Sequence, residues 1–210
     1  MAALFPIYLS LKNKDCLVVG GGKVAQRKVQ SLIAAEASVR VISPKITSDL
    51  LKLVHEGKIF WKQKKFHAED LENPFIVISA TDDENVNKEV ATLCMEKNIP
   101  VNVVDDPPKC TFHIPAVVRR GDFALAISTA GKSPMLAGKL RRQLEFQFGE
   151  EYEIYVQLLG EMRERILKEI PEENKRRKIF KRLVDSDLLD LIKEGKQSKI
   201  KERIEECMYS

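Results

Sequence analysis

Short runs of apolar residues alternate along the chain with stretches in which apolar residues recur at helical spacing. The runs at 16–20 and 75–80 are typical of buried strands, the first covered on both faces. The runs at 38–44, which Pro44 stops, and at 100–105 predict two more strands. Residues 58–66 alternate loosely and predict an edge strand. Helical patterns fall between these runs, at 23–36, 47–57 and 83–98. Strands that alternate with helices of this length indicate βαβ units around a parallel sheet.

The pattern changes after residue 113. Residues 116–129 read as two strands around a Gly121-Asp122 turn, which predicts an antiparallel hairpin. Ser133 and Pro134 open a helix over 133–148 as N-cap and first helical residue. One face of that helix carries Leu136, Leu140, Leu144 and Phe148. From Glu150 onward the chain is helical and charged, with breaks at Pro171 and Gly195 and a packing stripe formed by Leu158, Met162, Ile166 and Ile170.

These patterns predict an α/β fold in three parts. Residues 1–113 form a Rossmann-like, doubly wound parallel sheet. Residues 114–149 form an α+β region, and residues 150–210 form a small helical domain.

Composition narrows the class of protein. The chain has 210 residues, 44% of them hydrophobic and 31% charged, which indicates a packed core and not disorder. A formal net charge of +4 argues against a nucleic-acid binder. No apolar stretch approaches the roughly 18 residues of a membrane-spanning helix. The four cysteines form no CxxC pair, no His/Cys/Asp cluster has metal-ligand spacing, and a reducing cytoplasm is the expected compartment.

A glycine triplet stands between the first strand and the first helix. The order Gly20-x-Gly22-x-x-Ala25 is that of the dinucleotide fingerprint, with alanine allowed at the third place. Gly20 permits the tight turn, and Gly22 lets the backbone approach a pyrophosphate. Ala25 keeps the helix close to the sheet. A plain tight turn is the alternative, but the flanking strand and helix favour a dinucleotide site.

The end of the second strand leaves the choice between NAD and NADP open. A carboxylate that reads the ribose 2′-hydroxyl is expected there, but the chain has Ser43-Pro44-Lys45. Ser43 can hydrogen-bond a ribose. Arg40 and Lys45 leave room for a 2′-phosphate.

Four stretches together carry a family resemblance: "FPIYLSLKNKDCLVVGGGKVAQRKVQSLI", "SATDDENVN", "VNVVDDPPKCTFHIPAVVRRGDFALAISTAGKSP" and "MLAGKLRRQLE". In this order they resemble precorrin-2 dehydrogenase, the dehydrogenase module of siroheme synthases, over about residues 4–148. The resemblance implies NAD-dependent oxidation of precorrin-2 to sirohydrochlorin, and some members also insert iron. It implies a homodimer, with 114–149 as the dimerisation region.

The resemblance also implies site residues. Cofactor contacts fall on the loop, the end of the second strand and the end of the fourth: Gly20, Gly21, Gly22, Lys23, Val24, Ser43, Pro44, Lys45 and Thr81. The family's catalytic aspartate falls on Asp105, although some dehydrogenase-only relatives lack that acid. The regulatory serine of the siroheme synthase turn is matched here by Thr129.

Elementary chemistry supports a role for Asp105. It follows a predicted parallel strand, at the edge where ligands bind in open α/β sheets. A carboxylate there can accept a proton as a hydride leaves for the nicotinamide. The alternative is that Asp105 and Asp106 cap the Pro107-Pro108 turn. His113 is the rival acid–base group, but a lone histidine beside apolar residues is more often structural.

The substrate implied by the resemblance carries many carboxylates. Residues of the hairpin and of the turn after it are predicted to bind it: Arg119, Arg120, Ser128, Thr129, Lys132 and Ser133. A solvated helix face is the alternative for each single cation, as it is for Lys139, Arg141 and Arg142. Two further functions stay open, a non-catalytic dinucleotide sensor and a chelatase with a vestigial nucleotide site.

Overall fold

The computed structural model describes residues 4–209 and divides the chain into two compact units, Met1–Ile114 and Pro115–Ser210. The further predicted boundary at residue 149 lies inside the second unit and stays a prediction. Every predicted strand and helix is present, with ends displaced by up to four residues. Among the described residues, no helix is long and apolar enough to cross a membrane.

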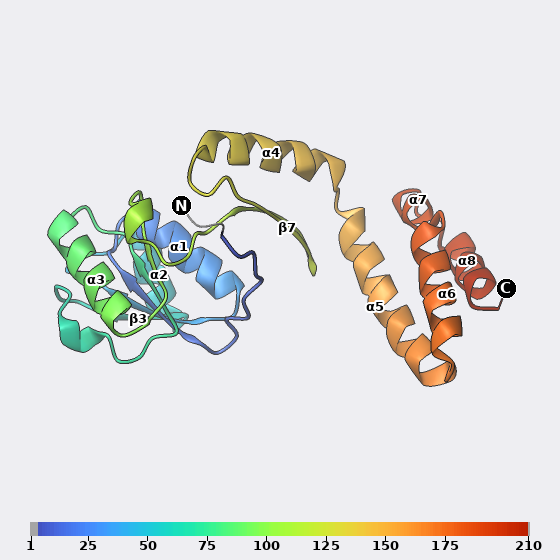
Figure 1. Ribbon diagram of the computed structural model, residues 1–210, viewed down its shortest axis with the longest axis horizontal. Coiled ribbons are helices and arrows are strands. Elements are labelled where there is room, and N and C mark those ends of the chain that lie inside the picture. The colour runs from blue at the N-terminus through green and yellow to red at the C-terminus, as the bar shows by residue number, and fades with distance from the viewer. Residues whose placement is uncertain (1–3, 210) are drawn as a thin grey trace. The chain divides into compact units, whose positions relative to one another are not determined.

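Figure 1 shows the first unit as a sheet with helices packed around it. The sheet has five parallel strands in the order β3-β2-β1-β4-β5. The strands are β1 (Asp15–Val19), β2 (Ser38–Ile42), β3 (Ile59–Lys62), β4 (Ile76–Ser79) and β5 (Val101–Val103). The order reverses between β1 and β4, which is the topological switch point of a doubly wound sheet. The predicted α/β class and the edge position of β3 are confirmed.

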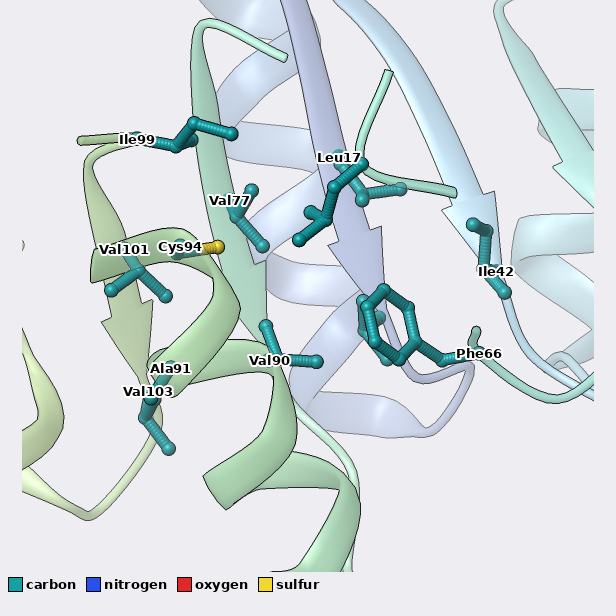
Figure 2. Packing of buried hydrophobic residues seen from close by; sticks show 12 residues of the cluster. Leu17, Ile42, Phe66, Val77, Val90, Ala91, Cys94, Ile99, Val101 and Val103 are labelled. Atoms are coloured by element: carbon teal, nitrogen blue, oxygen red, sulfur yellow. The ribbon is translucent and has the colours of Figure 1, made fainter. Parts of the chain in front are cut away.

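Helices cover both faces of this sheet. They are α1 (Lys23–Ala34), α2 (Ser48–His55) and α3 (Glu84–Glu96), with short 3₁₀ turns η1 (Ala68–Asp70) and η2 (Pro107–Lys109). Because alternate strand residues point to opposite faces, Val18 packs with α1 and α2 while its neighbour Leu17 packs with α3. Figure 2 shows Val90, Ala91 and Cys94 of α3 against β1, β4 and β5.

Each face of the sheet has a buried cysteine in its hydrophobic core, Cys16 on one face and Cys94 on the other. Cys16 and Cys94 are fully buried, and burial raises the pKa of each to about 11. A thiol with so high a pKa is a weak nucleophile at neutral pH. Both cysteines therefore act as small apolar packing residues, as predicted.

The second unit begins with a hairpin and continues as helices. Strands β6 (Ala116–Arg120) and β7 (Phe123–Ile127) pair antiparallel around Gly121, and Ser133 caps α4 (Pro134–Gln147) by accepting from the Leu136 amide. The later helices are α5 (Glu151–Glu169), α6 (Glu173–Asp185), α7 (Leu188–Lys193) and α8 (Gln197–Tyr209). Met162 and Ile166 of α5 are buried in their shared core, which confirms the packing role predicted for that stripe.

Candidate active site

One cavity of about 830 Å³ lies in the first unit where the strands end. Parallel strands bring their carboxyl ends to one edge, so residues that follow different strands meet there. Ten predicted site residues line this cavity: Gly20, Gly21, Gly22, Lys23, Val24, Ser43, Pro44, Lys45, Thr81 and Asp105. The phosphate loop and the candidate acid thus share one cavity.

The three glycines of the loop have different reasons to be glycine. Gly20 has a φ of +119°, and a Cβ there would lie 2.2 Å from the Ala80 carbonyl oxygen. A Cβ on Gly21 would lie 2.1 Å from the Lys45 carbonyl oxygen. A Cβ on Gly22 would meet nothing within 4 Å. The fold therefore requires Gly20 and Gly21, whereas the open space at Gly22 belongs to the cavity.

A Gly20→Ala variant should accordingly be unstable. The left-handed backbone and the overlap with Ala80 together should cost about 3 kcal/mol or more of unfolding free energy. Chemical denaturation, compared with Gly22→Ala as the matched control, measures this cost. We expect Gly22→Ala to lose less than about 1 kcal/mol. Equal losses in the two variants would contradict the assignment of separate roles.

The N-terminus of α1 provides an anion-binding group at the cavity. Gly22 is the N-cap, and no side chain caps the helix. The amides of the first turn have no intrahelical acceptor, since the first such bond runs from the Gln26 amide to the Gly22 carbonyl. Free N–H groups and the positive end of the helix dipole suit a pyrophosphate. The loop therefore fits the phosphates of a dinucleotide without further groups.

Charge is distributed unevenly around the cavity. Lys45 after β2 and Lys65 after β3 lie toward one edge of the sheet, whereas Asp82, Asp83 and Asp105 follow β4 and β5. Neither of these lysines forms an ion pair with a described residue. The cavity thus has a cationic end and an acidic end. The sequence pattern did not predict Lys65 as a site residue. It extended the third strand to residue 66, whereas β3 ends at Lys62 and Lys65 follows it.

The cationic end of the cavity, where an adenosine ribose is expected, differs from the prediction at Arg40. The Arg40 guanidinium donates to the Asp15 carboxylate from Nε, at 2.9 and 3.2 Å, and from a terminal nitrogen, at 2.7 Å. Arg40 does not line the cavity, so its predicted availability to a 2′-phosphate is wrong. Ser43 does line it, and its hydroxyl donates to the Lys45 carbonyl at 2.7 Å. The same hydroxyl oxygen can still accept a hydrogen bond from a ribose hydroxyl.

Asp105 occupies an unusual position at the acidic end. Its φ is +61°, in the left-handed region that aspartate tolerates better than most residues. Its carboxylate makes no side-chain hydrogen bond or ion pair with the described part of the chain. Neither carboxylate caps the turn, because Asp106, the N-cap residue of η2, makes no side-chain capping bond and pairs with Lys109 instead. Asp105 is therefore free to act on a ligand.

The other candidate reactive groups, Cys110 and His113, are not placed to act on a ligand in the cavity. The Cys110 thiol lies 3.2 Å from the Val103 carbonyl and 3.3 Å from that of Asp106, and burial raises its pKa. His113 is half-buried and is not among the residues that line the cavity. Residues 4–209 contain no group of three or more His, Cys, Asp or Glu side chains arranged to hold a metal ion.

The predicted substrate residues lie in the second unit. The Ser128 and Thr129 hydroxyls accept from the Ala130 and Ser133 amides and shape the turn. Lys132 and Arg119 are exposed and hold no ion pair with described residues.

The Arg120 side chain bonds residues of its own unit. Its side chain is 15% exposed, donates to the Glu145 carbonyl at 3.1 Å and pairs with Glu150 at 3.3 Å. Arg119 and Arg120 also point to opposite faces of β6. Ser133 is committed as the cap of α4. Lys132 and Arg119 are therefore the freer candidates for substrate carboxylates.

Comparison with known proteins identifies the family of this chain. A family model described as "Putative NAD(P)-binding" matches residues 7–116, more than half of the chain. The models "Sirohaem biosynthesis protein central" and "Sirohaem synthase dimerisation region" match residues 120–146 and 155–208. The chain belongs to the siroheme synthase family. The family assignment predicted from the sequence is confirmed.

Individual relatives agree with the family assignment. A siroheme synthase from Thioalkalivibrio sulfidiphilus is 37% identical over 204 residues, and one from Methylococcus capsulatus is 39% identical over 191. These alignments cover 97% and 91% of this chain but 42% and 40% of the relatives, so the chain spans about two-fifths of their length. Among solved structures, SirC, precorrin-2 dehydrogenase, matches with a TM-score of 0.82 and 29% identity, over 97% of this chain and 100% of that one.

Proposed function

We propose that this protein catalyses the NAD-dependent oxidation of precorrin-2 to sirohydrochlorin. The observation that carries the proposal is a single cavity with a phosphate loop at its centre and an unpaired carboxylate at its acidic end. The similarity to SirC over the whole of that chain supports the same reaction. A sensor of dinucleotides needs no acid beside the nicotinamide, so the free Asp105 favours an enzyme.

Different residues of the cavity bind different parts of the cofactor. The amides at the N-terminus of α1 hold the pyrophosphate, and Gly22 lets it approach. Pro44, Lys45 and Lys65 surround the adenosine ribose at the cationic end. A bound NAD supplies the hydride acceptor at the acidic end, where Thr81 and Asp105 lie.

Asp105 completes the reaction as the proton acceptor. Oxidation removes a hydride and a proton from the substrate and leaves one more double bond. The Asp105 carboxylate takes the proton, since it lines the cavity and has no side-chain partner among the described residues. Formation of NADH on addition of precorrin-2 in the absence of oxygen tests this function. Metal insertion without NAD would instead indicate a chelatase with a vestigial nucleotide site.

A homodimer is the proposed assembly, supported by the match of residues 155–208 to a dimerisation region. That match lies in α5 to α8, outside the 114–149 region expected from the sequence, so it supports a dimer but not an interface on α4.

The predicted apolar face of α4 needs revision, because Phe148 packs inside the unit against Phe123 and Tyr152 at 5.3 and 5.0 Å between ring centroids. Leu136 of the predicted face is exposed, but the most exposed apolar residues of α4 are Met135 and Phe146, at 88% and 95%. Eleven residues apart, they lie on the same side of the helix. We propose that this side contacts the second copy.

A Met135→Glu/Phe146→Glu double variant should therefore dissociate more readily. Each loss of an apolar anchor should raise the dimer Kd by about tenfold or more. Sedimentation velocity at micromolar concentration should show a dimer for the unmodified protein and a larger monomer fraction for the variant. Met95→Glu, on the exposed side of α3, is the matched control. A monomer in the unmodified protein, or unchanged dissociation in the variant, would count against this interface.

The cytoplasm is the proposed location. All four cysteines are free thiols, as expected of a protein kept in a reducing compartment.

A further inference from the structure

Asn87 of α3 is a half-buried polar residue that bonds two residues at the end of β4. Asparagine is a poor helix former, so its place inside a helix calls for a physical reason. The side-chain amide provides one, because both of its ends bond partners outside the helix. The oxygen accepts from the Ser79 hydroxyl at 2.7 Å, and the nitrogen donates to the Thr81 carbonyl at 3.0 Å.

The contact with Ser79 fixes the orientation of this amide. Ser79 is fully buried at the end of β4, where a hydroxyl without a partner is costly. Turning the amide by half a rotation would set its oxygen against the Thr81 carbonyl oxygen, and two acceptors do not bond each other. One orientation of Asn87 therefore satisfies both partners.

The Thr81 carbonyl belongs to the loop between β4 and α3, residues 80–83. All four residues of this loop line the cavity. The loop also lies against the phosphate loop, since a Cβ on Gly20 would lie 2.2 Å from the Ala80 carbonyl oxygen. No other described residue bonds the Thr81 carbonyl. The Asn87 side chain is therefore what joins this carbonyl to α3.

We propose that Asn87 is a positioning residue that holds the 80–83 loop in the shape that receives the nicotinamide half of NAD. The inference rests on the proposed function, in which that half lies at the acidic end beside Thr81 and Asp105. A Thr81 carbonyl released from Asn87 would let the loop turn and would change the wall of the cavity at that end. The pyrophosphate and the adenosine ribose bind at α1 and at the cationic end, so their binding should change little.

An Asn87→Asp variant tests this role. Its carboxylate can still accept from the Ser79 hydroxyl but cannot donate to the Thr81 carbonyl. We expect the Kd for NAD to rise about tenfold, as for the loss of one hydrogen bond. The Kd for ADP, which lacks the nicotinamide half, should stay nearly unchanged. Calorimetric titration measures both values, at a temperature where thermal unfolding shows the variant to be folded.

Two further variants separate the hydrogen bond from the added charge. Asn85→Asp places the same charge on an exposed position of the same helix and should bind both ligands normally. Ser79→Ala removes the other partner of the amide and should weaken NAD binding in the same direction. Since the two changes act on one network, Ser79→Ala/Asn87→Asp should bind NAD about as weakly as Asn87→Asp alone.

The proposal is overturned if Asn87→Asp binds NAD with unchanged affinity, or if Asn85→Asp loses as much. It is also overturned if NAD and ADP lose affinity equally, because that result indicates a general disturbance of the first unit. If Asn87→Asp does not fold, Ser79→Ala carries the same comparison of the two ligands. These titrations need no turnover, so they are read separately from NADH formation, which tests the proposed function.

Discussion

A Gly22→Asp variant should bind NAD at least about 100-fold more weakly than the unmodified protein and remain folded. The position has open space around its Cβ, so the fold tolerates a side chain there. The same side chain enters the space next to the first turn of α1 and places a carboxylate where phosphates bind. Like-charge contact of this kind costs several kcal/mol, and about 3 kcal/mol corresponds to 100-fold in Kd.

Titration of NAD by calorimetry or fluorescence measures the loss, and thermal unfolding checks the fold. Gln30→Asp adds the same charge to an exposed position of the same helix and should bind NAD normally. Gly22→Ala should show an intermediate loss, since it adds bulk without charge. If Gly22→Asp bound NAD with unchanged affinity, the dinucleotide role of this loop would be lost.

An Asp105→Asn variant should oxidise precorrin-2 roughly 100- to 10,000-fold more slowly, the usual cost of removing a general base. The amide keeps the size of the side chain and suits the left-handed backbone as well as aspartate does. NAD affinity should change little, because the phosphates bind at Gly22 and the start of α1. Asp106→Asn is the matched control, since that carboxylate is engaged by Lys109.

The outcome for metal insertion separates two roles of Asp105. If dehydrogenation survives in Asp105→Asn while insertion of cobalt or iron is lost, Asp105 serves chelation and the oxidation needs no protein base. If both activities survive, Asp105 has no catalytic role, and its conformation belongs only to the turn before η2.

The sequence was most informative where local physics decides the outcome. Continuous apolar runs gave the buried strands, and the Gly20-x-Gly22-x-x-Ala25 order placed the tight turn at the switch point of the sheet. Strand ends then brought residues of distant segments to one edge, so Asp105 and the loop could be expected to share a site.

Pairings across the sheet were beyond the reach of sequence patterns. Arg40 seemed free for a phosphate because its partner is 25 residues away. The parallel register sets Asp15 opposite Ser38 and Leu17 opposite Arg40, and this alignment brings Arg40 to the Asp15 carboxylate. In the same way, a stripe of apolar residues on α4 did not reveal that Phe148 joins Phe123 and Tyr152.

The most direct test of the account is an anaerobic assay of the purified protein with NAD and precorrin-2. We predict that NADH and sirohydrochlorin form together, one for one, without any added metal, and that Gly22→Asp abolishes both at the NAD concentration that saturates the unmodified protein. Binding of NAD without any NADH formation would contradict the account and indicate a dinucleotide sensor.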